Sequence, residues 1–176
     1  MNVLLISLYD EWCLGLRSLS AYLRARGRQA PIVHLGAHSN ALNKAGFYAL
    51  DERDFSQEFE TIRSLTERFE PGVIGISVCS EVFGVAAKLT AFLRNHTSAT
   101  IVWGGIDPTA SPDLAIQHAD AVCIGEGEGA MADLVDRVEA GASYADVANL
   151  WVRTGDEITR NDPRPLIQDL DSLPFS

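Results

Sequence analysis

The feature that most constrains the fold is a set of short apolar runs, rich in branched side chains, that recur along the chain. Each run is continuous rather than alternating, which is typical of strands buried on both faces of a sheet. The runs lie at residues 3–6, 32–35, 73–78, 100–103 and 121–124. We therefore expect five buried strands.

Between these runs, apolar side chains recur three or four positions apart, as they do on one face of a helix. Three such faces are Leu16, Leu19, Tyr22 and Leu23; Phe55, Phe59, Ile62, Leu65 and Phe69; and Val82, Val85, Leu89, Phe92 and Leu93. Further helices are expected near residues 112–118 and 126–139. Because strand and helix alternate, the strands should be parallel and joined by right-handed crossovers.

The predicted fold is a doubly wound, Rossmann-like α/β domain with a five-stranded parallel sheet in the flavodoxin-like order 2-1-3-4-5. A ligand crevice should lie beyond the carboxyl ends of the first, third and fourth strands. Residues 1–145 form this domain, and residues 146–162 form a small C-terminal β-hairpin around the turn at Thr154, Gly155 and Asp156. Residues 163–176 are proline-rich and read as a linker, whereas residues 36–54 show no clear period.

Charge and composition exclude several classes of protein. The net charge of the 176-residue chain is −10, so a nucleic-acid partner held by a basic face is not expected. No uninterrupted apolar run is long enough to span a membrane. Cys13, Cys79 and Cys123 lack the spacing of a metal or cluster site, and the N-terminus lacks a secretory signal. A soluble, cytoplasmic protein is expected.

The loop after the first strand contains Asp10, Trp12 and Gly15 in the spacing D-x-W-x-x-G. An aromatic side chain this close to the crevice is well placed to lie against a flat ligand. A surface aromatic at the start of a helix is the alternative interpretation.

Small polar residues follow the third strand, namely Ser77, Cys79 and Ser80. Their hydroxyls can cap the next helix or bond a ligand. Cys79 has no adjacent histidine or lysine that would activate its thiol, so it reads as a small buried residue.

Glycines end the fourth and fifth strands. The fourth is followed by Gly104, Gly105, Ile106, Asp107, Pro108 and Thr109, and the fifth by Gly125, Glu126, Gly127, Glu128 and Gly129. Paired glycines let another group approach the backbone closely. Free N–H groups at a helix start can bind a ligand, but the two glutamates favour hydroxyl or amide groups over anions.

No complete catalytic constellation falls in the predicted crevice. The four histidines have no metal-ligand spacing, and neither a Ser/His/Asp set nor a phosphate-binding G-x-x-x-x-G-K-[ST] loop is present. The chain is therefore expected to bind a ligand without a catalytic site of its own.

Taken together, four motifs in order resemble the cobalamin-binding N-terminal domains of cobalamin-dependent radical SAM enzymes. These are D-E-W-C-L-G at residues 10–15, S-V-C at 77–79, G-G-I-D-P-T at 104–109 and G-E-G-E at 125–128. The ending at residues 165–174 resembles the linker to a radical SAM barrel. The resemblance implies a cobalamin cofactor held by residues 1–145 and a barrel in cis that is not in this chain. That barrel would bind S-adenosylmethionine and an iron–sulfur cluster, often for methyl transfer.

The resemblance also implies roles for the motif residues. Ser77 and Ser80 would face the nucleotide tail of cobalamin, while Gly104 and Gly105 would admit its dimethylbenzimidazole. The segment Gly125, Glu126 and Gly127 would close over the ribose or the corrin amides. A bulky residue at position 105 is expected to abolish binding while sparing folding.

The first motif departs from a well-known cobalamin pattern. Many cobalamin domains carry D-x-H-x-x-G, whose histidine binds cobalt, whereas Trp12 occupies that position here. Indole has no ring nitrogen free to bind a metal. We hypothesise that cobalt has no protein histidine ligand and that Trp12 lies over or near the corrin. Such a cobalt would be easier to reduce.

Three alternatives remain open. A receiver-like signalling domain needs a carboxylate after the third strand and a lysine after the fifth, where Ser77 and Gly125 stand. A flavin or nucleotide module would suit the fold, but no glycine-rich loop follows the first strand. A stand-alone cobalamin carrier or sensor would keep the ligand without an enzyme.

Overall fold

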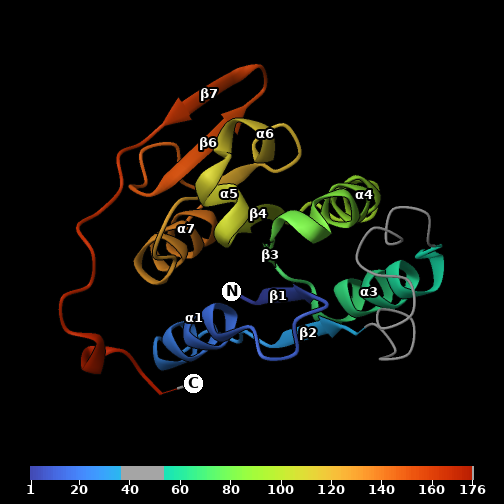
Figure 1. Ribbon diagram of the computed structural model, residues 1–176, viewed down its shortest axis with the longest axis horizontal. Helices are drawn as coiled ribbons and strands as arrows, with labels where there is room; N and C mark the ends of the chain where they lie inside the picture. Colours follow the sequence, from blue (N-terminus) through green and yellow to red (C-terminus); the bar gives the residue numbers. More distant parts are fainter. Residues whose placement is uncertain (37–53, 176) are drawn as a thin grey trace.

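A computed structural model describes residues 1–36 and 54–175, and Figure 1 shows its arrangement. The unassigned stretch at residues 36–54 therefore lies, except for its two ends, outside the described residues. Within the described part, one mixed sheet runs in the order β2-β1-β3-β4-β5-β6-β7. Its strands are β1 (Val3–Leu8), β2 (Ile32–Leu35), β3 (Val73–Ser77), β4 (Thr100–Gly104), β5 (Ala121–Cys123), β6 (Leu150–Thr154) and β7 (Glu157–Arg160).

The predicted fold class is confirmed, and the sheet differs from the predicted one in its extent. Strands β1 to β5 are parallel, in the order β2-β1-β3-β4-β5. The β6–β7 hairpin is not a separate unit, because β6 pairs antiparallel with β5 and continues the same sheet. This pairing satisfies the edge of β5, which a five-stranded sheet would leave exposed.

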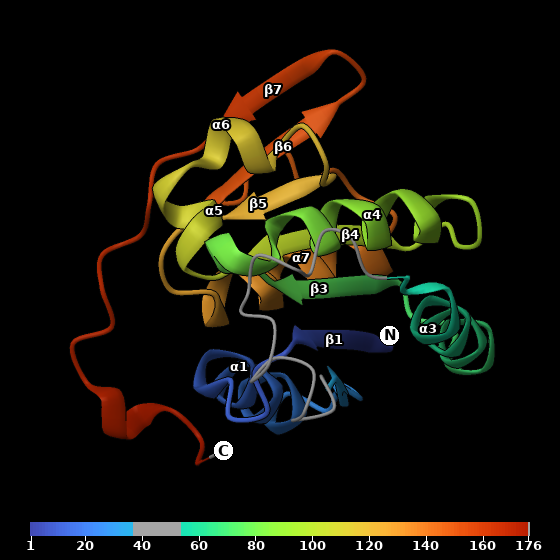
Figure 2. The same ribbon diagram turned by 45° about the vertical axis from the view of Figure 1, so that its right-hand side comes forward.

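Helices cover both faces of the sheet, as Figures 1 and 2 show. One face carries α1 (Leu14–Ala25) and α7 (Glu128–Glu139), and the other carries α3 (Ser56–Phe69) and α4 (Phe83–Arg94). Three short elements follow strand ends or precede helices: η2 (Ser80–Val82), α5 (Ile106–Ala110) and α6 (Pro112–Ala115). Helix α5 was not expected from the sequence.

The strand side chains divide between two cores, because successive residues of a strand point to opposite faces. In β3, Ile74 and Ile76 pack toward α3 and α4, and Val73 packs toward α1 and α7. The fully buried Trp103 joins the first of these cores, where its Nε1 donates to Thr90 Oγ1 at 2.9 Å. Gly75 adds no side chain to the second core, which leaves space beside β3 on the side of α1 and α7.

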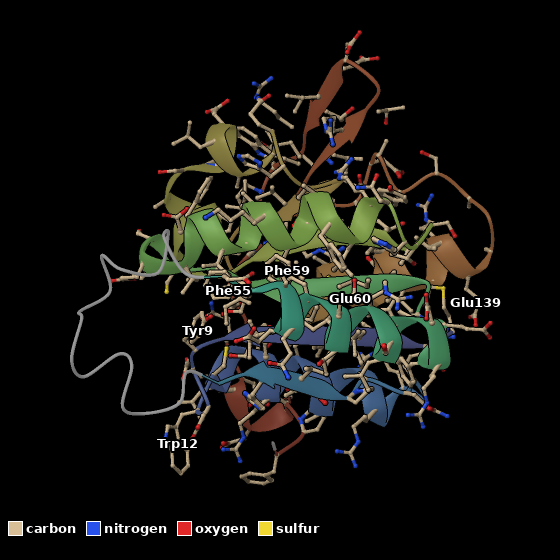
Figure 3. All side chains as sticks on the ribbon, turned by 90° about the vertical axis from the view of Figure 1, so that its right-hand side faces the viewer. Tyr9, Trp12, Phe55, Phe59, Glu60 and Glu139 are labelled. Atoms are coloured by element: carbon tan, nitrogen blue, oxygen red, sulfur yellow. The ribbon has the colours of Figure 1, made fainter. Side chains whose placement is uncertain are left out.

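Two further features frame the carboxyl end of the sheet. Tyr9, Phe55 and Phe59 form an aromatic cluster that joins the loop after β1 to α3, with ring centroids 6.3 and 5.7 Å apart (Figure 3). Residues 163–175, here called the C-terminal strap, run outside the domain from the hairpin back toward α1 and contain η3 (Leu170–Ser172) (Figure 1). No helix among the described residues is long and apolar enough to cross a membrane.

Candidate ligand cavity at the carboxyl edge of the sheet

A cavity of about 240 Å³ lies at the carboxyl ends of β3, β4 and β5, beneath α1 and α7. Doubly wound sheets place ligand crevices at this edge. The crevice was predicted beyond the first, third and fourth strands, whereas this cavity is lined by a residue of β5 and by none of β1. The lining residues are Gly15, Leu16, Leu19, Gly75, Ile76, Ser77, Val102, Gly104, Gly105, Cys123, Gly125, Glu126, Gly127, Glu128 and Met131. Seven of the thirteen site residues predicted from sequence are among them: Gly15, Ser77, Gly104, Gly105, Gly125, Glu126 and Gly127.

The cavity exists because small residues stand where larger ones would fill it. A Cβ on Gly75 would lie 2.9 Å from Leu5 Cδ2 and 3.6 Å from Met131 Cε. Cβ atoms on Gly104 and Gly127 would both meet Cys123, at 3.7 and 3.8 Å. The glycines of β3, of β4 and of the loop between β5 and α7 therefore leave this face of the sheet hollow.

Gly105 is required by the backbone as well as by the shape of the cavity. Its φ is +108°, and a Cβ would lie 2.7 Å from the carbonyl oxygen of Val78. Non-glycine residues are strained at such a φ. The expectation that a substitution of Gly105 would spare folding is therefore corrected: the loop itself depends on this glycine.

Thr109 joins the two glycine loops at the mouth of the cavity without lining it. Its hydroxyl donates to the carbonyl oxygen of Gly105 at 2.8 Å and accepts from the backbone N–H of Gly125 at 3.1 Å. Gly125 has a φ of +76°. The Thr109 side chain thus links the loops after β4 and β5 through hydrogen bonds to the backbone of both.

The two glutamates of the β5–α7 loop already have protein partners. Glu126 Oε2 accepts from the backbone N–H of Ile167 at 2.8 Å, and Glu128 Oε1 accepts from Ser18 Oγ at 2.8 Å. The first bond attaches the C-terminal strap, and the second ties α7 to α1. The guanidinium of Arg164, a residue of the strap, lies beside Gly129.

The loop after β1 lies beside the cavity rather than in it. Asp10 Oδ1 accepts from the backbone N–H of Trp12 at 2.9 Å, so this carboxylate shapes its own loop. The Trp12 side chain is 73% exposed and points away from the ribbon (Figure 3). Leu14 and Ile106, which also follow strand ends, are exposed to a similar degree.

The residues after β3 are divided between the two faces of the sheet. Ser77 lines the cavity, and its Oγ accepts from the Cys13 thiol at 3.4 Å. Cys79 packs against the core on the α3 and α4 face, where burial and then a hydrogen bond with Glu81 raise the pKa of its thiol. Ser80 Oγ donates to Asp107 Oδ1 at 2.7 Å and links two loops. Neither Cys79 nor Ser80 is among the residues that line the cavity.

Several lining residues were not singled out from sequence. Gly75 is marked by its position inside an otherwise branched run, a recognised sign of close approach to a strand. Leu19, Val102 and Met131 carry no such sign, because any buried helix or strand contains similar residues. Cys123 also lines the cavity, and burial raises the pKa of its thiol to about 12.

The fold and the cavity define a doubly wound α/β ligand-binding domain with its site at the carboxyl edge of the sheet. Within that class, the chain belongs to the B12-binding domain family, whose model matches residues 3–135. The resemblance of the four motifs to a cobalamin-binding domain is thereby confirmed. Among the described residues, no group of three or more His, Cys, Asp or Glu side chains is placed to hold a metal ion.

Two curated relatives match part of the chain. An uncharacterized methyltransferase, PH0819, of Pyrococcus horikoshii is 28% identical over 121 residues, which cover 66% of this chain and 26% of that protein. The anaerobic magnesium-protoporphyrin IX monomethyl ester cyclase of Synechocystis sp. is 32% identical over 103 residues, which cover 56% and 21%. The match therefore spans about a quarter of the length of these relatives.

Solved structures share the fold across nearly the whole chain. The radical S-adenosylmethionine methyltransferase TsrM from Kitasatospora setae, with cobalamin and a [4Fe-4S] cluster bound, matches with a TM-score of 0.71 and 16% identity. This match covers 99% of this chain and 31% of TsrM. The cobalamin-dependent S-adenosylmethionine radical enzyme OxsB, with aqua-cobalamin bound, matches with a TM-score of 0.70 and 18% identity, over 94% and 22%.

Proposed function

We propose that this chain is the cobalamin-binding module of a radical SAM enzyme. The observation that carries the proposal is the glycine-lined cavity, which opens at the carboxyl edge of the sheet. An apolar cavity of about 150 Å³ is enough to hold benzene. A cavity of about 240 Å³ therefore has room for the bicyclic base of the nucleotide tail.

The corrin ring would lie outside the cavity, over the ends of the strands. Trp12, Leu14 and Ile106 each follow a parallel strand, and each is more than 70% exposed. Leu14 and Ile106 adjoin Gly15 and Gly105 of the cavity lining, so together with Trp12 they would offer apolar surface beside the cavity for a ligand to cover. A large flat macrocycle suits such a surface, and cobalamin would supply methyl-transfer or radical chemistry there.

The protein would leave cobalt without a histidine ligand from the loop after β1. Trp12 stands at the motif position of that histidine, and its indole nitrogen is only a donor. Asp10, which precedes it, already bonds its own loop. Asp10 and Trp12 would therefore shape and cover the corrin site rather than bind the metal.

The reaction would take place in a partner domain. We propose a radical SAM barrel in cis after residue 176, which would bind S-adenosylmethionine and the iron–sulfur cluster outside this chain. The matched relatives are much longer than the chain, and the two relatives named as methyltransferases support methyl transfer as the reaction. The C-terminal strap, residues 163–175, would then be the connection to that barrel.

The test is to incubate the purified chain with hydroxocobalamin, desalt it and record the visible spectrum. We expect about one equivalent of retained cofactor with a base-off spectrum. Gly104→Leu should abolish retention because the side chain enters the cavity, whereas Ala142→Leu, at an exposed position, should not change it. A colourless protein would contradict the proposal.

The same spectrum tests the state of cobalt. A spectrum that shows a nitrogen of the protein on cobalt, rather than the nitrogen of the cofactor's own base, would overturn the absence of a histidine ligand. His34 would then be the first residue to replace, because its Nδ1 lies 3.2 Å from the carbonyl oxygen of Asp10 in the motif loop. Loss of the nitrogen signature in His34→Ala would assign the ligand.

A further inference from the structure

The cavity changes in polarity from its mouth to its floor. Ser77 and Gly104 pair with one another at the carboxyl ends of β3 and β4, and Gly75 pairs with Val102 two residues earlier. Two residues of a strand span roughly 6–7 Å. Ser77 therefore lies at the mouth, and Gly75 and Val102 lie at the floor.

The floor is apolar. Met131 of α7 faces Gly75, since a Cβ there would lie 3.6 Å from Met131 Cε, and Leu19 of α1 lies one helical turn beyond Gly15. Val102 and Met131 are each 2% exposed. The backbone groups of Gly75 and Val102 belong to the paired strands. Cys123 lies nearer the mouth, since a Cβ on Gly104 would be 3.7 Å from Cys123 Cβ. Burial raises the pKa of its thiol to about 12, so the thiol stays neutral.

The polar groups of the lining are at the mouth and are held there. Ser77 Oγ already accepts from Cys13, and Glu126 and Glu128 are bonded to Ile167 and Ser18. None of the lining side chains at the floor offers a strong hydrogen-bond donor or acceptor. A polar atom carried to the floor would lose its water without gaining a partner.

We infer that this floor selects the chemical class of the base at the end of the nucleotide tail. Benzimidazole and phenolic bases would be accepted, and purines, with an exocyclic amine and additional ring nitrogens, would be disfavoured. The inference rests on the proposed cobalamin function. Burying one unpaired polar group weakens binding by about 10- to 100-fold.

The experiment compares the dissociation constants of the chain for four corrinoids. These are cobalamin, p-cresolylcobamide, the adenine-containing pseudocobalamin, and cobinamide, which has no nucleotide. Because a cresol base cannot bind cobalt, this arm removes any contribution from detaching the base. We expect pseudocobalamin to bind at least tenfold more weakly than both cobalamin and p-cresolylcobamide.

The four affinities distinguish failure of base selection by the floor from failure of cobalamin binding. Equal affinity for pseudocobalamin and cobalamin overturns the selection by the floor while leaving cobalamin binding intact. Affinity for cobinamide as high as for cobalamin shows that the tail does not use the cavity, and it overturns the inference. Failure to bind any of the four corrinoids contradicts the proposed function itself.

A matched pair of variants tests the floor directly. Val102→Thr keeps the side-chain shape but adds a hydroxyl at the floor, so the preference for cobalamin over pseudocobalamin should narrow at least threefold. Val152→Thr makes the same change on β6, in the same core and at the same 2% exposure, but outside the cavity lining. The Val152→Thr chain should prefer cobalamin over pseudocobalamin by the same factor as the unmodified chain. An unchanged preference in Val102→Thr would overturn the inference.

Discussion

The backbone N–H of Ile167 donates a hydrogen bond to Glu126 Oε2 at 2.8 Å, and this bond fastens the C-terminal strap to a wall of the ligand cavity. Arg164 adds a second attachment, because its guanidinium pairs with Asp133 on α7 and its backbone N–H donates to Asn149 Oδ1 at 2.9 Å. The cavity wall and the strap therefore share the loop between β5 and α7.

Removing the Glu126 carboxylate should loosen the strap locally. A hydrogen bond to a charged acceptor contributes about 1.5 kcal/mol, so amide hydrogen exchange at Ile167 should accelerate about tenfold in Glu126→Ala. Glu126→Gln keeps an oxygen acceptor and should show a smaller acceleration. Unchanged exchange at Ile167 in Glu126→Ala would show that the strap does not depend on this bond.

Two neighbouring glycines should differ in their tolerance of alanine. Gly105→Ala should lower the free energy of unfolding by about 1–3 kcal/mol, because its φ is +108° and a Cβ would lie 2.7 Å from the Val78 carbonyl oxygen. Gly104→Ala should change it little, since its Cβ would meet only Cys123 Cβ at 3.7 Å. Urea unfolding of both variants is the measurement, and equal losses would refute the distinction.

Thr109 should contribute to stability through its hydroxyl rather than its methyl group. Thr109→Val removes the bonds to Gly105 and Gly125 and should lower the free energy of unfolding by about 1 kcal/mol. Thr109→Ser retains both bonds and serves as the control. If Thr109→Val and Thr109→Ser unfold at the same urea concentration, the Thr109 hydroxyl does not contribute to stability.

Cys123 should give the stability of the domain a dependence on alkaline pH. Burial raises the pKa of its thiol from 9.0 to about 12 in the folded chain. The unfolded state therefore loses this proton first, and the contribution to stability is complete below pH 9 and declines as pH rises toward 12. Unfolding measured from pH 8 to 11 should show a shallower decline in Cys123→Ala than in the unmodified chain. If the free energy of unfolding declines equally steeply with pH in both chains, the Cys123 thiol does not cause the decline.

The sequence predicted the elements of the fold because their patterns are local. A run such as Val73–Ser77 is recognisable from its own residues, and the alternation of strands and helices then restricts the connections. Once the strands were predicted to be parallel, the loops that follow them could be assigned to one edge of the sheet, because parallel strands bring their carboxyl ends together. The extent of the sheet was not predictable in this way, because pairing of β6 with β5 joins residues distant in the chain.

The candidate site was predictable only in part. Gly104, Gly105 and Gly125 were found because consecutive or spaced glycines at a strand end are visible in the sequence. Cys79 and Ser80 stand beside Ser77 in the chain but do not line the cavity, because the chain turns at the strand end into η2 and α4. Proximity in the sequence does not decide which face of a sheet a side chain reaches.

By itself, the sequence determined the fold class, the edge of the sheet that carries the site, and the family to which the motifs point. These depend on periodicity and on short motifs, both of which are written in neighbouring residues. The tertiary structure alone decided that Gly75, Val102 and Met131 form an apolar floor and that Glu126 holds the strap. These relationships join residues far apart in the chain, so only packing of the sheet against α1 and α7 could create them.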